Sequence, residues 1–172
     1  MQDHEQWLRS VPMEVGSYIA GFVDGEGSFN VSLRRRPDHR LGWDIDPSFN
    51  VSQRDRVILA WVKRIFGCGT LRERPDGVVY YEVRNVSMLR DRVVPFFKRF
   101  RFRSAAKKRN FAIFEKIVQT LQSGPLTEHM LREVVRLREM LNEGRGRKRK
   151  YEAHHVLEGK ILRDFTPNSS PL

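Results

Sequence analysis

One short stretch of the chain, residues 17–29, places an acid where it could hold a metal ion. The letters SYIAGFVDGEGSF describe a helical run that ends at Glu26, between Gly25 and Gly27, and passes directly into a strand. Glycine on both sides of the acid allows a ligand or another backbone to approach closely. A carboxylate is a hard oxygen ligand of the kind that Mg²⁺ prefers. The stretch therefore predicts a candidate metal site at the end of a helix, with Glu26 as a ligand.

The same helix has two faces to bury. At the helical period, one face is apolar and consists of Tyr18, Ile19, Phe22 and Val23. The opposite face carries small residues and an acid, namely Ser17, Ala20, Gly21 and Asp24. Small residues at this spacing allow the close approach of a second helix. Because the stretch occurs once in the chain, we expect the partner helix to come from a second copy, which predicts a homodimer.

The chain is strongly basic, which limits the kinds of partner that it is expected to bind. Its 172 residues include 32 Lys and Arg against 21 Asp and Glu, a formal charge of +11. Such an excess implies a polyanionic partner, with nucleic acid as the first candidate and an anionic membrane as the second. No apolar run approaches the roughly 20 residues of a membrane helix, and the N-terminus lacks the apolar core of a secretion signal. We therefore expect an intracellular protein with no membrane partner, for which a bacterial cytoplasm and an organelle are equally compatible.

Cysteine, histidine and chain length narrow the class further. The single cysteine, Cys68, excludes an internal disulfide and a cysteine-based zinc cluster. Of the five histidines, His154 and His155 are adjacent in the sequence and the other three are scattered. We therefore expect them to be surface residues and not metal ligands. With 40% apolar residues, the chain is long enough to bury the core of one folded domain.

Two hairpins of alternating strands are expected after the motif helix. The first strand runs from Ser28 to Arg34, and the second, interrupted by Pro47 at a bulge or edge, ends at Ser52 and Gln53. The second hairpin covers residues 70–84 and turns at residues 75–77, a Pro-Asp-Gly sequence. Each hairpin has an apolar and a polar face, which predicts an antiparallel sheet with helices on one side only.

Capping and breaking residues place the helices between and after the hairpins. We expect Asp55 to cap a helix over 57–66, Ser87 to cap a helix over 88–100 that restarts at Pro95, and Thr127 to cap a helix that ends near Asn142. A longer helix is expected over 104–122. The predicted class is α+β in the order αββαββα, followed by further helices. The predicted parts are a leader at 1–15, one domain at 16–143, and a basic linker with a last helix and tail at 144–172.

The polar face of the predicted sheet carries side chains that can read base edges in DNA. Arg pairs with guanine, Asn with adenine and carboxylates with the amino group of cytosine. A strand of about nine residues is about 30 Å long, which matches roughly nine base pairs. A solvated sheet face is the alternative for such a mixture of charges. The predicted DNA-binding residues are Asn30, Ser32, Arg34, Arg36, Asp44, Asp46, Ser48, Asn50, Arg72, Arg74, Tyr80, Glu82 and Arg84.

The motif and the order of elements resemble those of a known family. The letters IAGFVDGEG, Ile19 to Gly27, are similar to the LAGLIDADG motif of homing endonucleases, with Glu26 in place of the last acid. The resemblance extends over residues 13–142 and includes GCGTLRER at the second hairpin. It implies a homodimer with paired motif helices at its axis, saddle-shaped sheets in the major groove, and cleavage of both strands across the minor groove.

The resemblance also implies roles for individual residues. Glu26 and the Gly25 carbonyl would bind the metal, and Gln53 would position a water. Asp24 would bond across the helix interface, near the start of a helix of the partner. Lys107 is our choice for the basic residue of the active site, with Lys108 and Arg103 as rivals and Arg56 as a helper. The predicted dimer interface is Ser17, Ala20, Gly21 and Asp24, and the predicted catalytic residues are Glu26, Gln53 and Lys107.

Phosphodiester hydrolysis needs an activated water and neutralisation of the charge on the phosphate, which carboxylate-bound divalent metals supply. Together with this chemistry, the resemblance implies a homodimeric, intron-encoded DNA endonuclease that uses Mg²⁺, with Mn²⁺ or Ca²⁺ able to occupy the site, and that cuts a long, near-palindromic target. The basic tracts 34–36 and 144–150 are expected to touch backbone phosphates. The alternatives are a maturase that binds intron RNA, a DNA-binding regulator of the same fold, and a membrane-associated or structural basic protein. The acid at position 26 favours the nuclease.

Overall fold

The computed structural model describes residues 2–144, 150, 151 and 153–157, and it confirms the predicted α+β class. The predicted order αββαββα begins at α2, and η1 is a π-helical turn that joins α4 to α5. The elements are α1 (Gln2–Ser10), α2 (Met13–Glu26), β1 (Gly27–Arg35), β2 (Trp43–Gln53), α3 (Arg56–Phe66), β3 (Thr70–Glu73), β4 (Val79–Val83), α4 (Val86–Met88), η1 (Leu89–Val93), α5 (Val94–Arg99), α6 (Ala105–Gln122), α7 (Glu128–Met140) and η2 (Leu141–Gly144).

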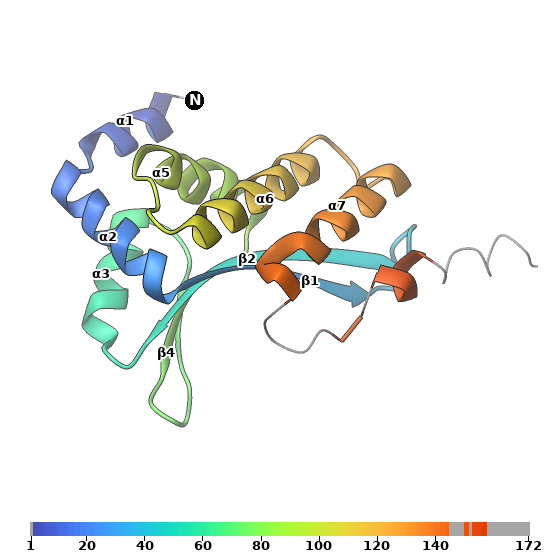
Figure 1. The fold of residues 1–172 in the computed structure, drawn as a ribbon, viewed down its shortest axis with the longest axis horizontal. Helices are drawn as coiled ribbons and strands as arrows, with labels where there is room; N and C mark the ends of the chain where they lie inside the picture. The colour runs from blue at the N-terminus through green and yellow to red at the C-terminus, as the bar shows by residue number, and fades with distance from the viewer. Residues whose placement is uncertain (1, 145–149, 152, 158–172) are drawn as a thin grey trace, which may run out of the picture.

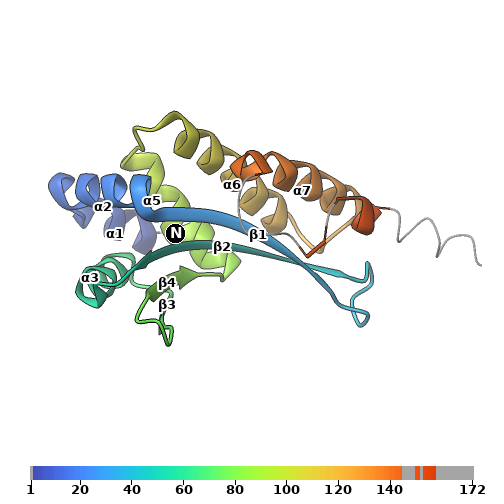
Figure 2. The same ribbon diagram turned by 60° about the horizontal axis from the view of Figure 1, so that its bottom comes forward.

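The two hairpins form one four-stranded antiparallel sheet in the order β1-β2-β4-β3. Side chains alternate between the two faces of each strand, and the apolar members of the alternation are buried on one face. Figure 1 shows α6 and α7 above β1 and β2, on the side of this buried face. Figure 2 shows α6 and α7 together on the same side of these two strands. The prediction of a sheet with helices on one side is therefore confirmed for the described part of the chain.

Aromatic rings from three helices meet the rings of the sheet in the core. Phe29 of β1 lies 5.0 Å from Phe114 of α6, measured between ring centroids. Phe49 of β2 lies 5.5 Å from Phe97 of α5 and 5.9 Å from Phe66 of α3. Aromatic pairs at these distances contribute about 0.5–1.5 kcal/mol beyond the area that they bury. The core thus packs α3, α5 and α6 against the inner face of the sheet.

Helix termini follow the capping residues of the sequence, with one exception. The side chains of Asp55, Ser104 and Thr127 accept hydrogen bonds from the first turns of α3, α6 and α7. The prediction that Ser87 caps the next helix was wrong, because the Asn85 carboxamide accepts from the Met88 N–H at 3.0 Å, so the helix begins two residues earlier. The restart predicted at Pro95 takes the form of the π-helical turn just before it.

The buried face of the motif helix α2 keeps Ile19 and Val23, as expected, but is rotated toward the small residues. The helix begins at Met13, directly after Pro12, and buries Gly16, Ile19, Ala20 and Val23. Ala20, assigned to the partner, is 3% exposed, whereas Tyr18, assigned to the core, is 56% exposed. The reason is Phe100: a Cβ on Gly16 would lie 2.2 Å from its ring, so this ring packs directly on the helix backbone and sets the rotation of α2.

Both ends of the described chain pack on the domain. The Trp7 indole of α1 donates to the Ile65 carbonyl at 2.8 Å, and Val156 is buried in the core. Most of the basic tract predicted at 144–150 lies outside the described residues, as do residues 158–172 of the predicted last helix and tail. No helix in the described segments has both the length and the apolar character that crossing a membrane requires.

Candidate active site and nucleic-acid interface

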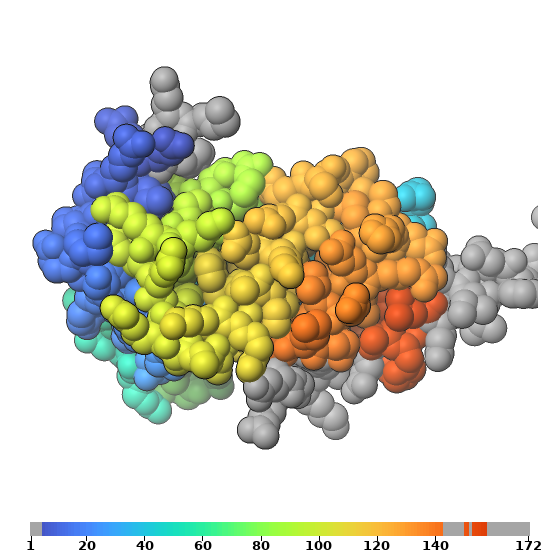
Figure 3. Space-filling view, turned by 45° about the horizontal axis from the view of Figure 1, so that its top comes forward, coloured from blue at the N-terminus to red at the C-terminus, as the bar shows by residue number. Residues whose placement is uncertain are grey.

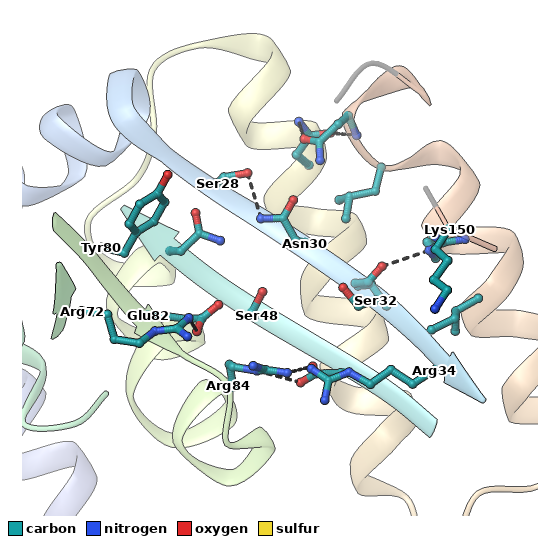
Figure 4. Close-up of a pocket in the computed structure, with 18 of the residues that line it drawn as sticks. Ser28, Asn30, Ser32, Arg34, Ser48, Arg72, Tyr80, Glu82, Arg84 and Lys150 are labelled. Carbon is teal, nitrogen blue, oxygen red and sulfur yellow. Dashed lines mark hydrogen bonds and ion pairs between the residues drawn. The ribbon is translucent and has the colours of Figure 1, made fainter. Parts of the chain in front are cut away.

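The outer face of the sheet lines an open groove of about 1300 Å³ (Figure 4). All of the predicted DNA-binding residues except Arg36 and Asp44 line it. The strand register explains this, since Ser28 pairs with Asn50, Asn50 with Glu82 and Glu82 with Thr70 in one row across the sheet. A strand that keeps its register puts every second side chain on the same face.

The structure changes the surroundings of several of these residues. Ser48 is buried, although it was expected on the exposed face. Arg36 follows β1 in a turn and bonds Asp38 at 2.8 Å, and Arg74 follows β3 in a turn, 2.9 Å from Asp76. The Arg36 guanidinium lowers the pKa of Asp38 to about 2, chiefly by hydrogen bonding. Arg74 therefore lies at a hairpin turn rather than within its strand, and Arg36 lies in the turn where the sequence placed it.

Arginines cover the carboxylates on the outer face. Arg34 and Arg84 both bind Asp46, and Arg72 binds Glu82 at 2.8 Å. The Asp46 and Glu82 side chains are 16% and 17% exposed, well below the arginines that bind them. The groove thus presents guanidinium groups where the sequence suggested a mixture of arginines and acids.

Lys107 lies beside the motif acid at the end of α2. Its Nζ donates to the carbonyl of Gly27, the residue that follows Glu26. Burial lowers the pKa of Lys107, and the charges of Asp24 and Glu26 oppose this effect. Glu26 is exposed, whereas Lys107 is half-buried. The structure therefore brings together two of the three predicted catalytic residues.

Asp24 binds the start of α6 within its own chain. Its carboxylate accepts from the Arg103 N–H at 2.8 Å, the Ser104 N–H at 2.9 Å and the Ser104 hydroxyl. Burial alone would raise the pKa of Asp24, but these hydrogen bonds and the charge of Lys107 lower it. The resemblance implies that Asp24 bonds to the partner subunit. In the single chain, Asp24 joins α2 to Ser104 at the start of α6, three residues before Lys107. Figure 3 shows this start of α6, in yellow-green, against the blue N-terminal helices.

The other predicted members of the site lie in different settings. Gln53 ends β2, two residues beyond Val51, the partner of Gly27, and its side chain accepts from the Arg54 N–H at 2.8 Å. Arg56 lies 3.4 Å from Glu73, so it is directed toward β3. Arg103 and Lys108 are exposed. Among the basic rivals, Lys107 is thus the one whose side chain bonds to the motif in the described structure, whereas Arg103 bonds to it through its backbone.

The donor groups at the end of α2 fit part of a divalent-metal site. In the described segments, no three His, Cys, Asp or Glu side chains lie close enough together to hold a metal ion by themselves. Mg²⁺ commonly takes one or two carboxylates and fills its remaining positions with water and substrate phosphates. The exposed Glu26 carboxylate fits that pattern, as does the carbonyl of Gly25 near the helix end, where carbonyls lack helical partners.

Side chains also cover the free edge of β1. Three alternate carbonyls, those of Gly27, Phe29 and Val31, accept hydrogen bonds from Lys107, Asn142 and Arg138 respectively. Edge strands expose such groups to unwanted pairing, and here the donors come from α6, η2 and α7. The contact with Gly27 fixes the position of Lys107 along β1, the strand whose outer face lines the groove.

Sequence reasoning missed Arg138 and Asn142. Arg138 is buried and also donates to the Tyr151 carbonyl at 3.0 Å. A signal existed, because Val134, Arg138 and Leu141 follow helical spacing, which places a charge on the apolar face of α7. Asn142 adopts a left-handed φ of 57°, and its N–H donates to Asn110 at 3.0 Å. The role of Asn142 depends on contacts with Asn110 and Phe29, which are far away in the sequence and could not be predicted from it.

A second, smaller groove of about 320 Å³ lies along α2. It is lined by the exposed Met13, Ser17 and Gly21, together with Asp24 and the chain around Phe100. A Cβ on Gly21 would meet no atom within 4 Å. The small residues of α2 therefore border open space in one copy of the chain.

Comparison with known proteins gives a consistent result. Residues 19–137 match the family model described as LAGLIDADG endonuclease. The chain is 37% identical to homing endonuclease I-ApeII of Aeropyrum pernix over 106 residues, which are 60% of this chain and 62% of that protein. It is 29% identical to DNA endonuclease I-CvuI of Chlorella vulgaris over 117 residues, 67% of this chain and 73% of that one.

Solved structures share the fold. The archaeal intron-encoded homing endonuclease I-Vdi141I, complexed with DNA, superimposes with a TM-score of 0.76 at 30% identity and covers 87% of this chain and 96% of its own. Homing endonuclease I-TnaI gives a TM-score of 0.72 at 28% identity, over 86% of this chain and 96% of that one. I-SmaMI, bound to uncleaved DNA in the presence of calcium ions, gives 0.71 at 25% identity and covers 76% of this chain and 46% of that one.

Proposed function

Because the chain belongs to the LAGLIDADG endonuclease family, we propose that it is a site-specific DNA endonuclease that hydrolyses phosphodiester bonds. The observation that carries this proposal is the contact between Lys107 and the Gly27 carbonyl, which sets a cation beside the exposed acid Glu26. This pair adjoins a groove whose outer-face arginines suit the major groove of DNA. Intron-encoded relatives such as I-Vdi141I support an intron-encoded origin for this chain as well.

The proposed chemistry divides among the residues near the end of α2. Glu26 and the Gly25 carbonyl would hold a divalent metal, for which Mg²⁺ is the first candidate. A metal in such a site lowers the pKa of a bound water and offsets charge on the phosphate. Gln53 orients the attacking water, and Lys107 stabilises charge or moves a proton near the scissile phosphate. Asp24 secures Lys107 by holding the start of α6 against α2.

We propose a homodimer that brings two copies of this site to one duplex. The support is the groove along α2, where Ser17 and Gly21 leave room for a second helix. Ala20, first assigned to this interface, contributes little surface because it is buried within the subunit. Two equivalent sheets would cover about twenty base pairs, and two-fold symmetry would favour a near-palindromic target.

The substitution Gly21→Leu tests this assembly. A Cβ at this position meets no atom of the subunit within 4 Å, and leucine is a better helix former than glycine, so we expect the variant subunit to fold. Self-association should fall by tenfold or more, which is about 1.4 kcal/mol. Sedimentation equilibrium with and without DNA measures the change. Ala112→Leu, on the exposed surface of α6, is the matched control and should leave association unchanged. If the Gly21 variant associated as strongly as the native protein, α2 would not form the dimer interface.

Cleavage of supercoiled plasmids that carry a random-site library tests the proposed activity. Linear product is expected with Mg²⁺ and absent with a chelator, and sequencing of the cut ends gives the target. Parallel reactions with Mn²⁺ and Ca²⁺ define the metal preference. Binding to intron RNA, or to DNA without any cleavage under all metal conditions, would instead identify a maturase or a regulator.

A further inference from the structure

Asp46 lies between two arginines on the outer face of the sheet. It stands on β2, and Arg34 of β1 and Arg84, just after β4, reach it from opposite sides. Arg84 donates through Nε to Oδ1 at 3.1 Å and through Nη2 to Oδ2, and Arg34 donates through Nη2 to the same Oδ2. Figure 4 shows the two guanidinium groups meeting over β2.

These contacts use most of the hydrogen-bonding capacity of Asp46 but leave N–H groups of both arginines free to bind DNA. The Asp46 side chain is 16% exposed, whereas Arg34 and Arg84 are 52% and 39% exposed. A carboxylate has about four lone-pair positions, and three are taken here. A guanidinium has five N–H donors, so each arginine keeps the two that a bidentate pair with guanine uses.

The electrostatics explain why one acid holds both side chains. Two guanidinium groups at this separation repel each other, and a carboxylate between them offsets the repulsion. Fixing both side chains before DNA arrives also lowers the entropy lost on binding. Without Asp46, each arginine would gain rotamer freedom and move away from the other.

Building on the proposed function, we propose that Asp46 is a positioning residue that presents Arg34 and Arg84 to two guanines in each half of the target. Asp46 itself does not accept a bond from cytosine. Glu82 shows the simpler form of the same arrangement, since it lies beneath a single arginine, Arg72, at 2.8 Å. The target is therefore expected to carry guanine at the positions opposite these arginines.

The substitution Asp46→Asn tests this inference in a binding selection from random DNA, performed on the full chain without metal so that no DNA is cut. Guanine preference should fall roughly tenfold at two positions at once, the order of one bidentate contact at each. Removing one negative charge should also tighten binding to non-target DNA. A purely structural defect would lower the melting temperature and weaken binding to every sequence alike.

Two further variants complete the experiment. Arg84→Lys should weaken guanine preference at only one of the two positions, which identifies them even if the Asp46 variant does not fold. Asp38→Asn is the matched control, because it removes the same charge from an Arg–Asp pair at the hairpin turn. A shift from cytosine to adenine at a single position in Asp46→Asn would show that Asp46 reads a base directly and overturn the inference. Absence of sequence preference in the native protein would instead count against the proposed function.

Discussion

Replacing Glu26 with glutamine is expected to abolish DNA cleavage while leaving DNA binding intact. Glutamine keeps the size and hydrogen-bonding capacity of the side chain but removes the charge that binds a divalent metal. Because metal binding supplies several kcal/mol of stabilisation to the transition state, cleavage should fall by about 10³-fold or more. Single-turnover cleavage and gel-shift binding on the same DNA measure the two effects separately.

A second acid on the same helix provides the control for this experiment. Glu14 is exposed in the first turn of α2, at the opposite end from Glu26. Glu14→Gln should leave the cleavage rate within twofold of the native rate. If the Glu26 variant retained cleavage, the metal ligand would have to be sought elsewhere.

Replacing Lys107 with methionine is expected to slow cleavage by about 10²–10⁴-fold, the usual contribution of a residue that transfers a proton or stabilises charge. Methionine preserves the half-buried length of the side chain but loses the ammonium that contacts the Gly27 carbonyl. Lys108→Met is the matched control, since Lys108 is exposed one residue later, and it should weaken binding only slightly. The cleavage rates of both variants are compared at saturating DNA. An equal loss of rate in the two variants would show that Lys107 has no specific catalytic role.

The pH dependence of cleavage gives a second test of Lys107. Burial lowers the pKa of Lys107, so its ammonium loses the proton at a lower pH than that of an exposed lysine. If the charged form acts, the cleavage rate falls as pH rises through this lowered pKa. Lys107→Arg keeps its charge at all relevant pH values, so its residual activity should lack this alkaline fall. An identical alkaline limb in both proteins would assign the titration to another group.

The sequence determined the elements and their order because these depend on local patterns. Alternation along Ser28–Arg34 separates a buried from a polar face, whatever the rest of the chain does. The caps at Asp55 and Thr127 act within a single turn and occur where expected. The motif around Glu26 is contiguous, so it too identified the family without the fold.

Only the tertiary structure decided how the site residues pair. Asp24 contacts a segment about 80 residues away, and Asp46 contacts an arginine 38 residues away. Such partners are chosen by how α2, α6 and the strands pack, and no local pattern encodes that packing. The same holds for the rotation of α2, which the Phe100 ring sets by resting on Gly16. Residue types and spacing thus predicted which groups carry the chemistry, while long-range packing determined which of them meet.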